Sequence, residues 1–327
     1  MSKSIFGWFA LGLAALAAAL QAADARPAAA ISHVIVIVME NTNAEKSGGA
    51  PYIYGNAADA PYINSVLLPR YAHAVNFRDP LPLGVPSEPH YVWLEAGTNS
   101  FEDFTFKEGL TGDFDPSVLR STASADHLTA QIEATGGRVT WMAYQEGMSS
   151  ETGACPVNSS GKTRYAAKHN PFVFFQDVSG LPPSKSNAYC AAHHRPLSAL
   201  AKDMARGVVA NYVFVTPNLC HDMHDKCGNP SRVRNGDDWL EAELPAMIGW
   251  ANHSKAVIFL VWDEGHETRK LPFLAIGPQV RKGYAGPVAY DHGSIIRTVE
   301  KVFGLPVLGT VRGSRDLGDL FQAGAFQ

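Results

Sequence analysis

Ser32-His-Val-Ile-Val-Ile-Val-Met39 is a nearly continuous run of apolar, mostly β-branched residues that is followed at once by Glu40-Asn41. Such a run is typical of a strand buried on both faces of a largely parallel sheet. The pattern recurs twice: residues 211–217 precede a polar stretch, and residues 256–262 precede Asp263-Glu264. The sequence therefore predicts three buried strands that deliver acidic residues at their carboxyl ends.

Helical patterns lie between these strands, at residues 126–134, 196–206 and 237–252. Strands that alternate with helices predict an α/β fold, a three-layer sandwich with a central, mostly parallel sheet. Ligands bind such sheets beyond the carboxyl ends of the strands, which is where the acidic residues fall. We expect one catalytic domain over residues 26–327, with a cysteine-containing insertion near 150–195.

The composition excludes several classes of protein. The 327 residues include 27 Lys and Arg against 31 Asp and Glu, a net charge of −4 that is too small to drive binding to nucleic acid. Hydrophobic residues make up 46% and charged residues 18%, which argues against disorder and for a large core.

The first residues resemble a secretory signal peptide. Lys3 is followed by an apolar run over residues 5–20 and by small residues up to Ala25. The alternative is an uncleaved anchor, although the run is shorter than the ~20 residues that span a bilayer. We therefore predict cleavage after residue 25, a secreted or periplasmic protein, and no stable membrane insertion.

Four cysteines, an even number in an exported chain, predict two disulfides. Three pairings are possible, and Cys155 with Cys190 and Cys220 with Cys227 are preferred because they close the shorter loops. A zinc cluster is the alternative, but the usual Cys-x2-Cys spacing is absent.

The strand-end residues Glu40, Asn41, Asp263 and Glu264 are candidate metal ligands. Any one acid at a strand end is more often solvated. Several that converge from separate strands would repel one another without a cation, so together they favour a metal site.

Histidines and acids are also concentrated in His221-Asp222-Met223-His224-Asp225, which follows the second strand. This mixed set of nitrogen and oxygen donors suits a divalent transition metal, and the alternative is a polar loop with a capping Asp. His292 could add a ligand or polarise a phosphate oxygen, although a lone histidine is more often a helix-start residue.

Ser87 precedes Pro89, a residue suited to a first helical turn, and is predicted at the N-cap of a helix. Capping is its ordinary role. A hydroxyl near both a helix N-terminus and a metal would also be activated as a nucleophile. No Gly-x-Ser-x-Gly motif occurs in the sequence, which disfavours an ordinary α/β-hydrolase triad.

Read in order, a series of short motifs resembles the phosphoesterase family of bacterial and fungal acid phosphatases and phospholipases C, within the alkaline-phosphatase-like superfamily. The similarity is greatest to the short secreted acid phosphatases, including phosphoinositide phosphatases. The motifs span nearly the whole mature chain and are Val38–Asn41, Pro86–Tyr91, Trp141–Glu146, Lys168–Phe172, Thr216–Asn218, Asp222–Asp225, Gly236–Leu240, Trp262–Glu264 and His292–Thr298.

The resemblance implies roles for particular residues. Glu40, Asn41, Asp263 and Glu264 would hold a metal with Ser87. The phosphate or a second cation would be lined by Asp222, His224, Asp225 and His292, so that Asp225 is a further candidate metal ligand. The family usually has Asn at the positions of His90 and His221, so the phosphate contact expected of residue 90 depends on a donating histidine. His169 and Arg297 are weaker candidates.

The resemblance thus implies hydrolysis of phosphate monoesters through a phosphoseryl intermediate. A phospholipase C acting on phospholipid or phosphoinositide headgroups is the alternative, for which Tyr91, Trp93 and Phe101–Phe106 could form an apolar rim. A non-catalytic, metal-stabilised binding protein is a third possibility. Oxygen ligands suit calcium, magnesium or manganese, while the histidines permit zinc or iron. The sequence leaves open the number of metals, the natural substrate, the pH optimum and the oligomeric state.

Overall fold

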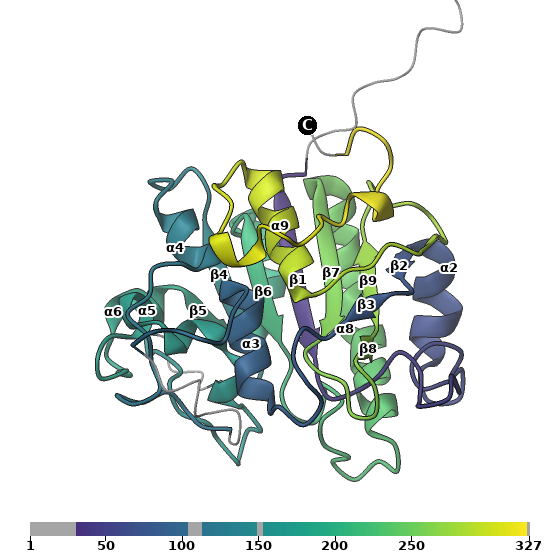
Figure 1. Cartoon of the computed structure of the whole chain (residues 1–327), viewed down its shortest axis with the longest axis horizontal. Helices are drawn as coiled ribbons and strands as arrows, with labels where there is room; N and C mark the ends of the chain where they lie inside the picture. Colours follow the sequence, from purple (N-terminus) through teal and green to yellow (C-terminus); the bar gives the residue numbers. More distant parts are fainter. Residues whose placement is uncertain (1–30, 104–112, 149–152, 326–327) are drawn as a thin grey trace, which may run out of the picture.

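A computed structural model describes residues 31–103, 113–148 and 153–325, so the predicted signal peptide lies outside the described residues (Figure 1). Its main feature is an eight-stranded sheet in the order β10-β2-β9-β7-β1-β6-β4-β5. The strands are β1 (His33–Met39), β2 (Ala72–Ala74), β4 (Trp141–Gln145), β5 (His194–Pro196), β6 (Tyr212–Thr216), β7 (Ala256–Trp262), β9 (Phe273–Ile276) and β10 (Ala285–Gly286), while β3 (Phe77–Arg78) and β8 (Lys270–Leu271) pair separately.

The three strands predicted from apolar runs form the centre of this sheet. β1 pairs in parallel with β6 on one side and with β7 on the other. β4 and β5 continue the parallel arrangement, whereas β9 runs antiparallel to β7 and β2. The prediction of a central, mostly parallel sheet is confirmed. The carboxyl ends of β1, β6 and β7 consequently meet at one edge.

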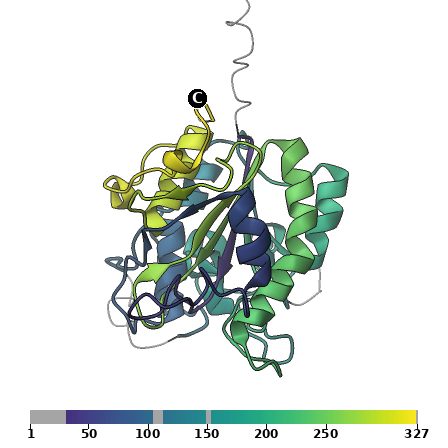
Figure 2. The same ribbon diagram turned by 90° about the vertical axis from the view of Figure 1, so that its right-hand side faces the viewer.

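Alternate residues of β1 face two separate cores. Val34, Val36 and Val38 belong to one core, and Ile35 and Ile37 belong to the other. The first core is covered by α3 (Ser87–Ala96) and α9 (His292–Phe303), and the second by α7 (Leu200–Arg206) and α8 (Arg232–Ser254). Figure 2 shows α8 and the yellow C-terminal segment on opposite sides of the sheet, which makes a three-layer sandwich.

The predicted helices exist with shifted ends. The helix expected over 126–134 is α4 (Leu128–Glu133), and that over 196–206 is a short 3-10 turn (Leu197–Ala199) followed by α7. α8 begins five residues before the predicted residue 237 because the Ser231 side chain caps it, accepting a hydrogen bond of 3.3 Å from the Arg234 amide. The remaining helices are Ile63–Leu67, α2 (Leu68–Arg70), Ala167–His169, Pro171–Phe174, α5 (Gln176–Ser179), α6 (Ala188–Ala192), Gly309–Val311 and Gly318–Leu320.

Both preferred disulfides, Cys155–Cys190 and Cys220–Cys227, are present. The first joins two ends of the predicted insertion, since Cys190 lies in α6, and the second closes the loop that follows β6. Among the described residues, no helix combines the length and the apolar character needed to cross a membrane.

Candidate active site

The carboxyl ends of β1 and β7 bring two of the predicted acidic groups together. Met39 is in register with Trp262, so the residues that follow them, Glu40 and Asp263, are neighbours at the end of the sheet. The Asp263 amide donates to the Met39 carbonyl over 2.9 Å, and the Glu40 amide donates to the Asp222 carbonyl over 2.7 Å. Glu40, Asp222 and Asp263 are all buried. Glu40 therefore lies between an acid from the β7 end and an acid from the β6 end.

The loops that carry these acids are held by asparagines. Asn41 has a φ of +34°, a conformation that Asn tolerates better than most residues. Its amide N–H donates to Asp263 Oδ1 and its side chain donates to Glu40 Oε2, both over 3.1 Å. Further along, Asn43 Oδ1 accepts hydrogen bonds from the amides of His266 and Glu267. The ends of β1 and β7 are thus bonded to each other beyond the sheet.

Ser87 reaches this cluster from the first turn of α3. Pro86 is the N-cap residue and Ser87 is already helical, so the prediction that Ser87 caps the helix is wrong. Its Oγ instead lies 3.0 Å from Glu40 Oε2 and 3.0 Å from Glu264 Oε1. A hydroxyl has one proton and can donate to only one of these carboxylates. The second contact requires a protonated carboxyl group or a cation.

Burial makes this group of acids electrostatically costly. Burial, together with the charge of Glu40, raises the pKa of Glu264 to about 8 and raises the pKa values of Asp222 and Asp263 well above the usual range. Asp222 Oδ2 and Asp263 Oδ2 are buried and accept no hydrogen bond. Buried oxygens of this kind need a proton or a positive charge beside them.

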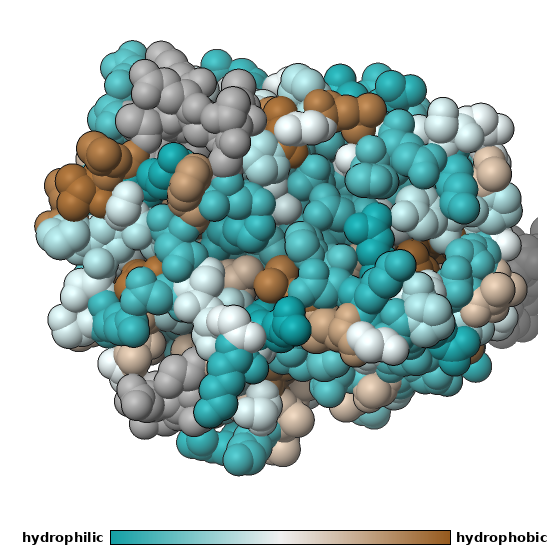
Figure 3. Space-filling view, turned by 90° about the horizontal axis from the view of Figure 1, so that it is seen from below, coloured by the Kyte–Doolittle hydropathy of each residue, from teal (hydrophilic) through white to brown (hydrophobic). Residues whose placement is uncertain are grey.

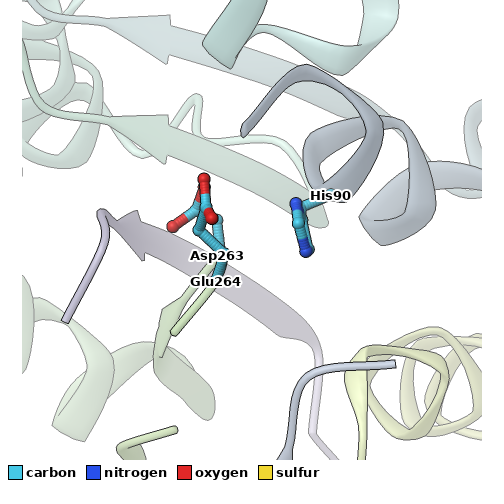
Figure 4. A group of neighbouring side chains, drawn as sticks. All are labelled: His90, Asp263 and Glu264. Atoms are coloured by element: carbon cyan, nitrogen blue, oxygen red, sulfur yellow. The ribbon is translucent and has the colours of Figure 1, made fainter. Parts of the chain in front are cut away.

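The donors fit a hard divalent cation. Glu40, Asn41, Ser87, Asp263 and Glu264 offer oxygen atoms, and the unpartnered carboxylate oxygens are free to bind an ion. Side-chain atoms of His90, Asp263 and Glu264 also lie within 4.8 Å of one another, and Figure 4 shows these three side chains around a common space beside β1.

His90 is better placed to supply a positive charge than to bind a metal. Its Nδ1 lies 2.9 Å from the Pro86 carbonyl, which can only accept, so this nitrogen carries a proton. Its Nε2 lies 3.1 Å from Asp79 Oδ1. Burial alone would lower the pKa of His90, but the contact with Asp79 raises it above the usual value. Both N–H groups of a charged ring would face these acceptors, so the ring could act on a phosphate through its positive charge.

His169, which the sequence made only a weaker candidate, is buried among the acids of the site. Its Nε2 is 3.2 Å from Glu40 Oε1, its Nδ1 is 3.6 Å from Asp222 Oδ2, and its ring stacks on Tyr91 with centroids 4.8 Å apart. Burial, with the charges of Lys168 and His224, holds the pKa of His169 well below the usual range. It is a neutral group between two carboxyl groups.

His292 is buried at the start of α9, as a helix-start residue would be, but it also faces the end of β7. Its Nε2 donates to the Trp262 carbonyl over 3.0 Å, and its Nδ1 has no hydrogen-bond partner. Burial lowers the pKa of His292 to about 4. The ring is therefore neutral, with a lone pair available to a ligand.

The loop after β6 divides its residues between the interior and the surface. Asp222 is fully buried beside Glu40, and the ring of His224 lies 6.2 Å from that of His169. Asp225 instead contacts His224 Nδ1 at 2.8 Å and Arg164 at 3.2 Å, so the structure does not bring this candidate ligand to the Ser87 cluster. Met223, with a φ of +79°, turns the backbone between the inward Asp222 and the outward Asp225. His221 likewise points outward, to Glu146 at 2.9 Å.

Asp79 is not among the residues that the sequence pattern predicts, and no separate role is predicted for Lys168. Asp79 directly follows β3, so the strand-end signal applied, but a two-residue strand has too few residues to show a periodic pattern. Arg297, a weaker candidate, pairs with Glu300 at 2.8 Å.

The apolar rim differs from the expected one. Tyr91 and Phe101 are buried, Trp93 is half-buried, and Phe104 and Phe106 lie outside the described residues. Exposed apolar side chains occur instead at Phe114, Val118 and Leu119.

Solved structures of other proteins share this fold. A Vibrio parahaemolyticus protein of the alkaline phosphatase superfamily matches 88% of this chain and 70% of its own at a TM-score of 0.53 and 10% identity. Murine ectonucleotide pyrophosphatase/phosphodiesterase 5 matches 89% of this chain and 100% of its own at a TM-score of 0.51 and 10% identity. At such identities these likenesses show the fold, an alkaline-phosphatase-like sandwich.

The chain belongs to the Phosphoesterase family, whose model matches residues 82–306, and it is a phosphoric ester hydrolase. It is 30% identical to a phosphatidylinositol-3-phosphatase of Mycobacterium tuberculosis over 92% of this chain and 85% of that protein. A phosphate-repressible acid phosphatase of Penicillium chrysogenum is 26% identical over 68% of this chain, which spans half of the fungal protein. The predicted resemblance is confirmed, and family membership argues against a non-catalytic binding protein.

Proposed function

We propose that this protein is a secreted, metal-dependent phosphatase that hydrolyses phosphate monoesters through a phosphoseryl intermediate on Ser87. The observation that carries the proposal is the position of Ser87 Oγ, 3.0 Å from both Glu40 and Glu264. A serine at this point has its hydroxyl directed at acids that could take its proton, and away from the helix amides.

The metal would be held by Glu40, Asn41, Asp263 and Glu264 together with Ser87. When bound, a divalent cation would lower the pKa of the serine hydroxyl and neutralise charge on the phosphate oxygens. Calcium, magnesium and manganese suit the oxygen donors, and the nearby His292 and His169 leave zinc possible.

The side chains of the protein carry out the other steps of the reaction. Ser87 Oγ passes its proton to Glu40 or Glu264 and attacks phosphorus. The bond to the leaving oxygen breaks, and this oxygen takes up the proton from that carboxyl group and departs as the alcohol. The charged ring of His90, held by Asp79, stabilises negative charge on the phosphoryl group through its own positive charge. Asp222, His224 and His292 line the remaining space, where the attacking water of the second step would be positioned. That water displaces the serine oxygen and releases phosphate, which restores the hydroxyl.

The test of this function is Ser87→Ala. Loss of a covalent nucleophile is expected to lower the turnover of an aryl phosphate by ~10³-fold or more without changing the fold. Ser65→Ala, at an exposed helical position, is the matched control and should keep full activity. Turnover by Ser87→Ala at the wild-type rate would reject Ser87 as the nucleophile.

A second candidate function is hydrolysis of phospholipid or phosphoinositide headgroups. The exposed side chains of Phe114, Val118 and Leu119 favour it, because Phe114 N donates to Glu88 Oε2 over 2.7 Å, immediately beside Ser87. Figure 3, which shows the lower face of Figure 1, has a compact group of hydrophobic residues at its left side. Faster turnover of headgroups in vesicles than of a soluble aryl phosphate would select this function.

Export is part of the same proposal, and the two disulfides support it. Cleavage after residue 25 would place the catalytic domain, residues 26–327 with the insertion near 150–195, in an oxidising compartment where the two disulfides are stable.

A further inference from the structure

Asp113 places a carboxylate beside the first turn of α3. Its Oδ1 accepts a hydrogen bond of 3.0 Å from the amide of Glu88, the residue that follows Ser87. Its Oδ2 forms an ion pair with the ammonium group of Lys168. An internal anion thus lies one peptide unit from the proposed nucleophile, bound to one N–H group and one cation.

Lys168 belongs to the site as well as to Asp113. It precedes His169, whose ring is 3.2 Å from Glu40, and only 19% of the Lys168 side chain is exposed. Burial alone would lower the pKa of Lys168, but the charges of Asp113, Glu40 and Asp263 raise it. The ammonium group therefore lies in the field of the same carboxylates that surround Ser87.

The backbone around Asp113 is held by other contacts. Phe114 N donates to Glu88 Oε2 over 2.7 Å, and Asp115 Oδ2 accepts from Ser159 N over 2.8 Å. The Asp113 side chain is 28% exposed, so its carboxylate can turn toward water without unfolding the segment. The ion pair with Lys168 can therefore be exchanged for another anion.

We propose that Lys168 and the Glu88 amide form a subsite for a phosphoryl oxygen, and that Asp113 occupies this subsite until the substrate phosphate displaces it. This inference rests on the proposed function, since it concerns the phosphate that Ser87 attacks. The exchange replaces one anion by another beside the same ammonium group. A dianionic monoester displaces the carboxylate better than a singly charged diester does, so Asp113 favours monoesters.

The test is Asp113→Asn, which keeps the size of the side chain and removes its charge. Inorganic phosphate is titrated calorimetrically into the full chain as purified, and KM and kcat are measured with an aryl phosphate. A site occupied by its own anion nine-tenths of the time binds a competitor about tenfold more weakly than a free site. We expect Asp113→Asn to bind phosphate about tenfold more tightly and to lower KM more than it changes kcat.

Asp115→Asn is the matched control, because it removes a charge two residues away that contacts Ser159 and not α3. Its phosphate affinity should equal that of the wild type. Lys168→Met should weaken phosphate binding about tenfold or more, and adding Asp113→Asn to it should bring no further gain. A misfolded variant would not bind phosphate more tightly than the wild type. The expected increase in phosphate affinity therefore also shows that Asp113→Asn is folded.

Unchanged or weaker phosphate binding by Asp113→Asn would overturn the inference, as would equal tightening by Asp115→Asn. Phosphate binding can be measured without turnover, so the subsite can be tested independently of the proposed function. Tightening in a protein that hydrolyses no phosphate ester would keep the subsite and reject the function. Active hydrolysis without tightening would reject the subsite alone.

Discussion

Two buried histidines, His127 and His169, each lie between two carboxyl groups and stack on an aromatic ring, yet they differ in charge. His127 is 2.9 Å from Glu95 and 3.1 Å from Asp177, whereas His169 makes contacts of 3.2 and 3.6 Å. Burial alone would lower the pKa of either ring. Asp177 and Glu95 overcome burial and raise the pKa of His127 to about 9, while the pKa of His169 stays well below its usual range.

The two groups differ in how many hydrogen-bond donors and how much water surround the acids. Glu95 Oε1 also accepts hydrogen bonds of 2.6 Å from the amide and the hydroxyl of Thr129, and Asp177 is 47% exposed to water. Around His169, Asp222 Oδ2 is buried without a donor, and Lys168 adds a competing positive charge. In the first group both carboxylates are paired with His127, although Glu95 Oε2 is buried without a partner. In the second group Glu40 Oε1, Asp222 Oδ2 and Asp263 Oδ2 all lack a hydrogen-bond partner, and this group fits an external cation and a phosphate.

Both groups are attached to α3, which explains their division of roles. Glu95 lies near the C-terminal end of this helix and Ser87 begins it. The network around His127 anchors one end to α4 and α5, while the other end carries the nucleophile. Removing a charged group should therefore lower the stability of the protein at the His127 end of α3. At the Ser87 end it should raise the stability of the metal-free protein.

The largest effect is expected from Asp263→Asn. Loss of a metal ligand should lower aryl phosphate turnover by ~10³-fold or more. In chelator-treated protein the same change should raise the melting temperature by a few degrees. The variant lacks one buried carboxyl group that otherwise has to take up a proton or repel its acidic neighbours. Thermal unfolding with and without chelator measures this. If the chelator-treated variant melts at a lower temperature than the chelator-treated wild type, the charge of Asp263 is already compensated in the metal-free protein.

His127→Gln should act on stability and leave kcat unchanged. The folded-state pKa of about 9 exceeds the ordinary value of 6.5, so the ion pair contributes fully below about pH 6.5, and this contribution is lost as the pH rises through 9. The variant should be less stable than the wild type by on the order of 3 kcal/mol at pH 6, and this gap should narrow by pH 10.

Urea unfolding at the two pH values measures the gap. Exposed His253→Gln is the control and should show no such pH dependence. A gap that widens with pH would mean that His127 is neutral in the folded protein, like His169.

The smallest effect is expected from His90→Asn, which keeps a donor but removes its charge. Loss of this positive charge near the phosphoryl group should lower kcat by about tenfold, and Asp79→Asn should do the same because it removes the acid that raises the pKa of His90. Steady-state kinetics with an aryl phosphate decide the matter. A loss near that of Asp263→Asn, with loss of bound metal, would show that His90 is a ligand.

Strand-end chemistry was predictable only where a strand was long enough to recognise. The seven-residue runs of β1 and β7 predicted the positions of Glu40, Asp263 and Glu264. The two residues of β3 are too few to predict that Asp79 follows a strand. Within one loop, Asp222 and Asp225 looked equivalent in sequence. A backbone turn at Met223 separates them, and side-chain direction in a loop follows from backbone angles that composition does not encode.

By itself the sequence determined the three buried strands, the parallel sheet, the preferred disulfide pairs and the family, since these follow from local apolar runs, short loop lengths and ordered motifs. The tertiary structure decided which acids share Ser87, that His90 is held by Asp79, and that Asp113 lies on the helix start. Those contacts join residues far apart in the chain, and their distances depend on how the strands and α3 pack, which no local pattern specifies.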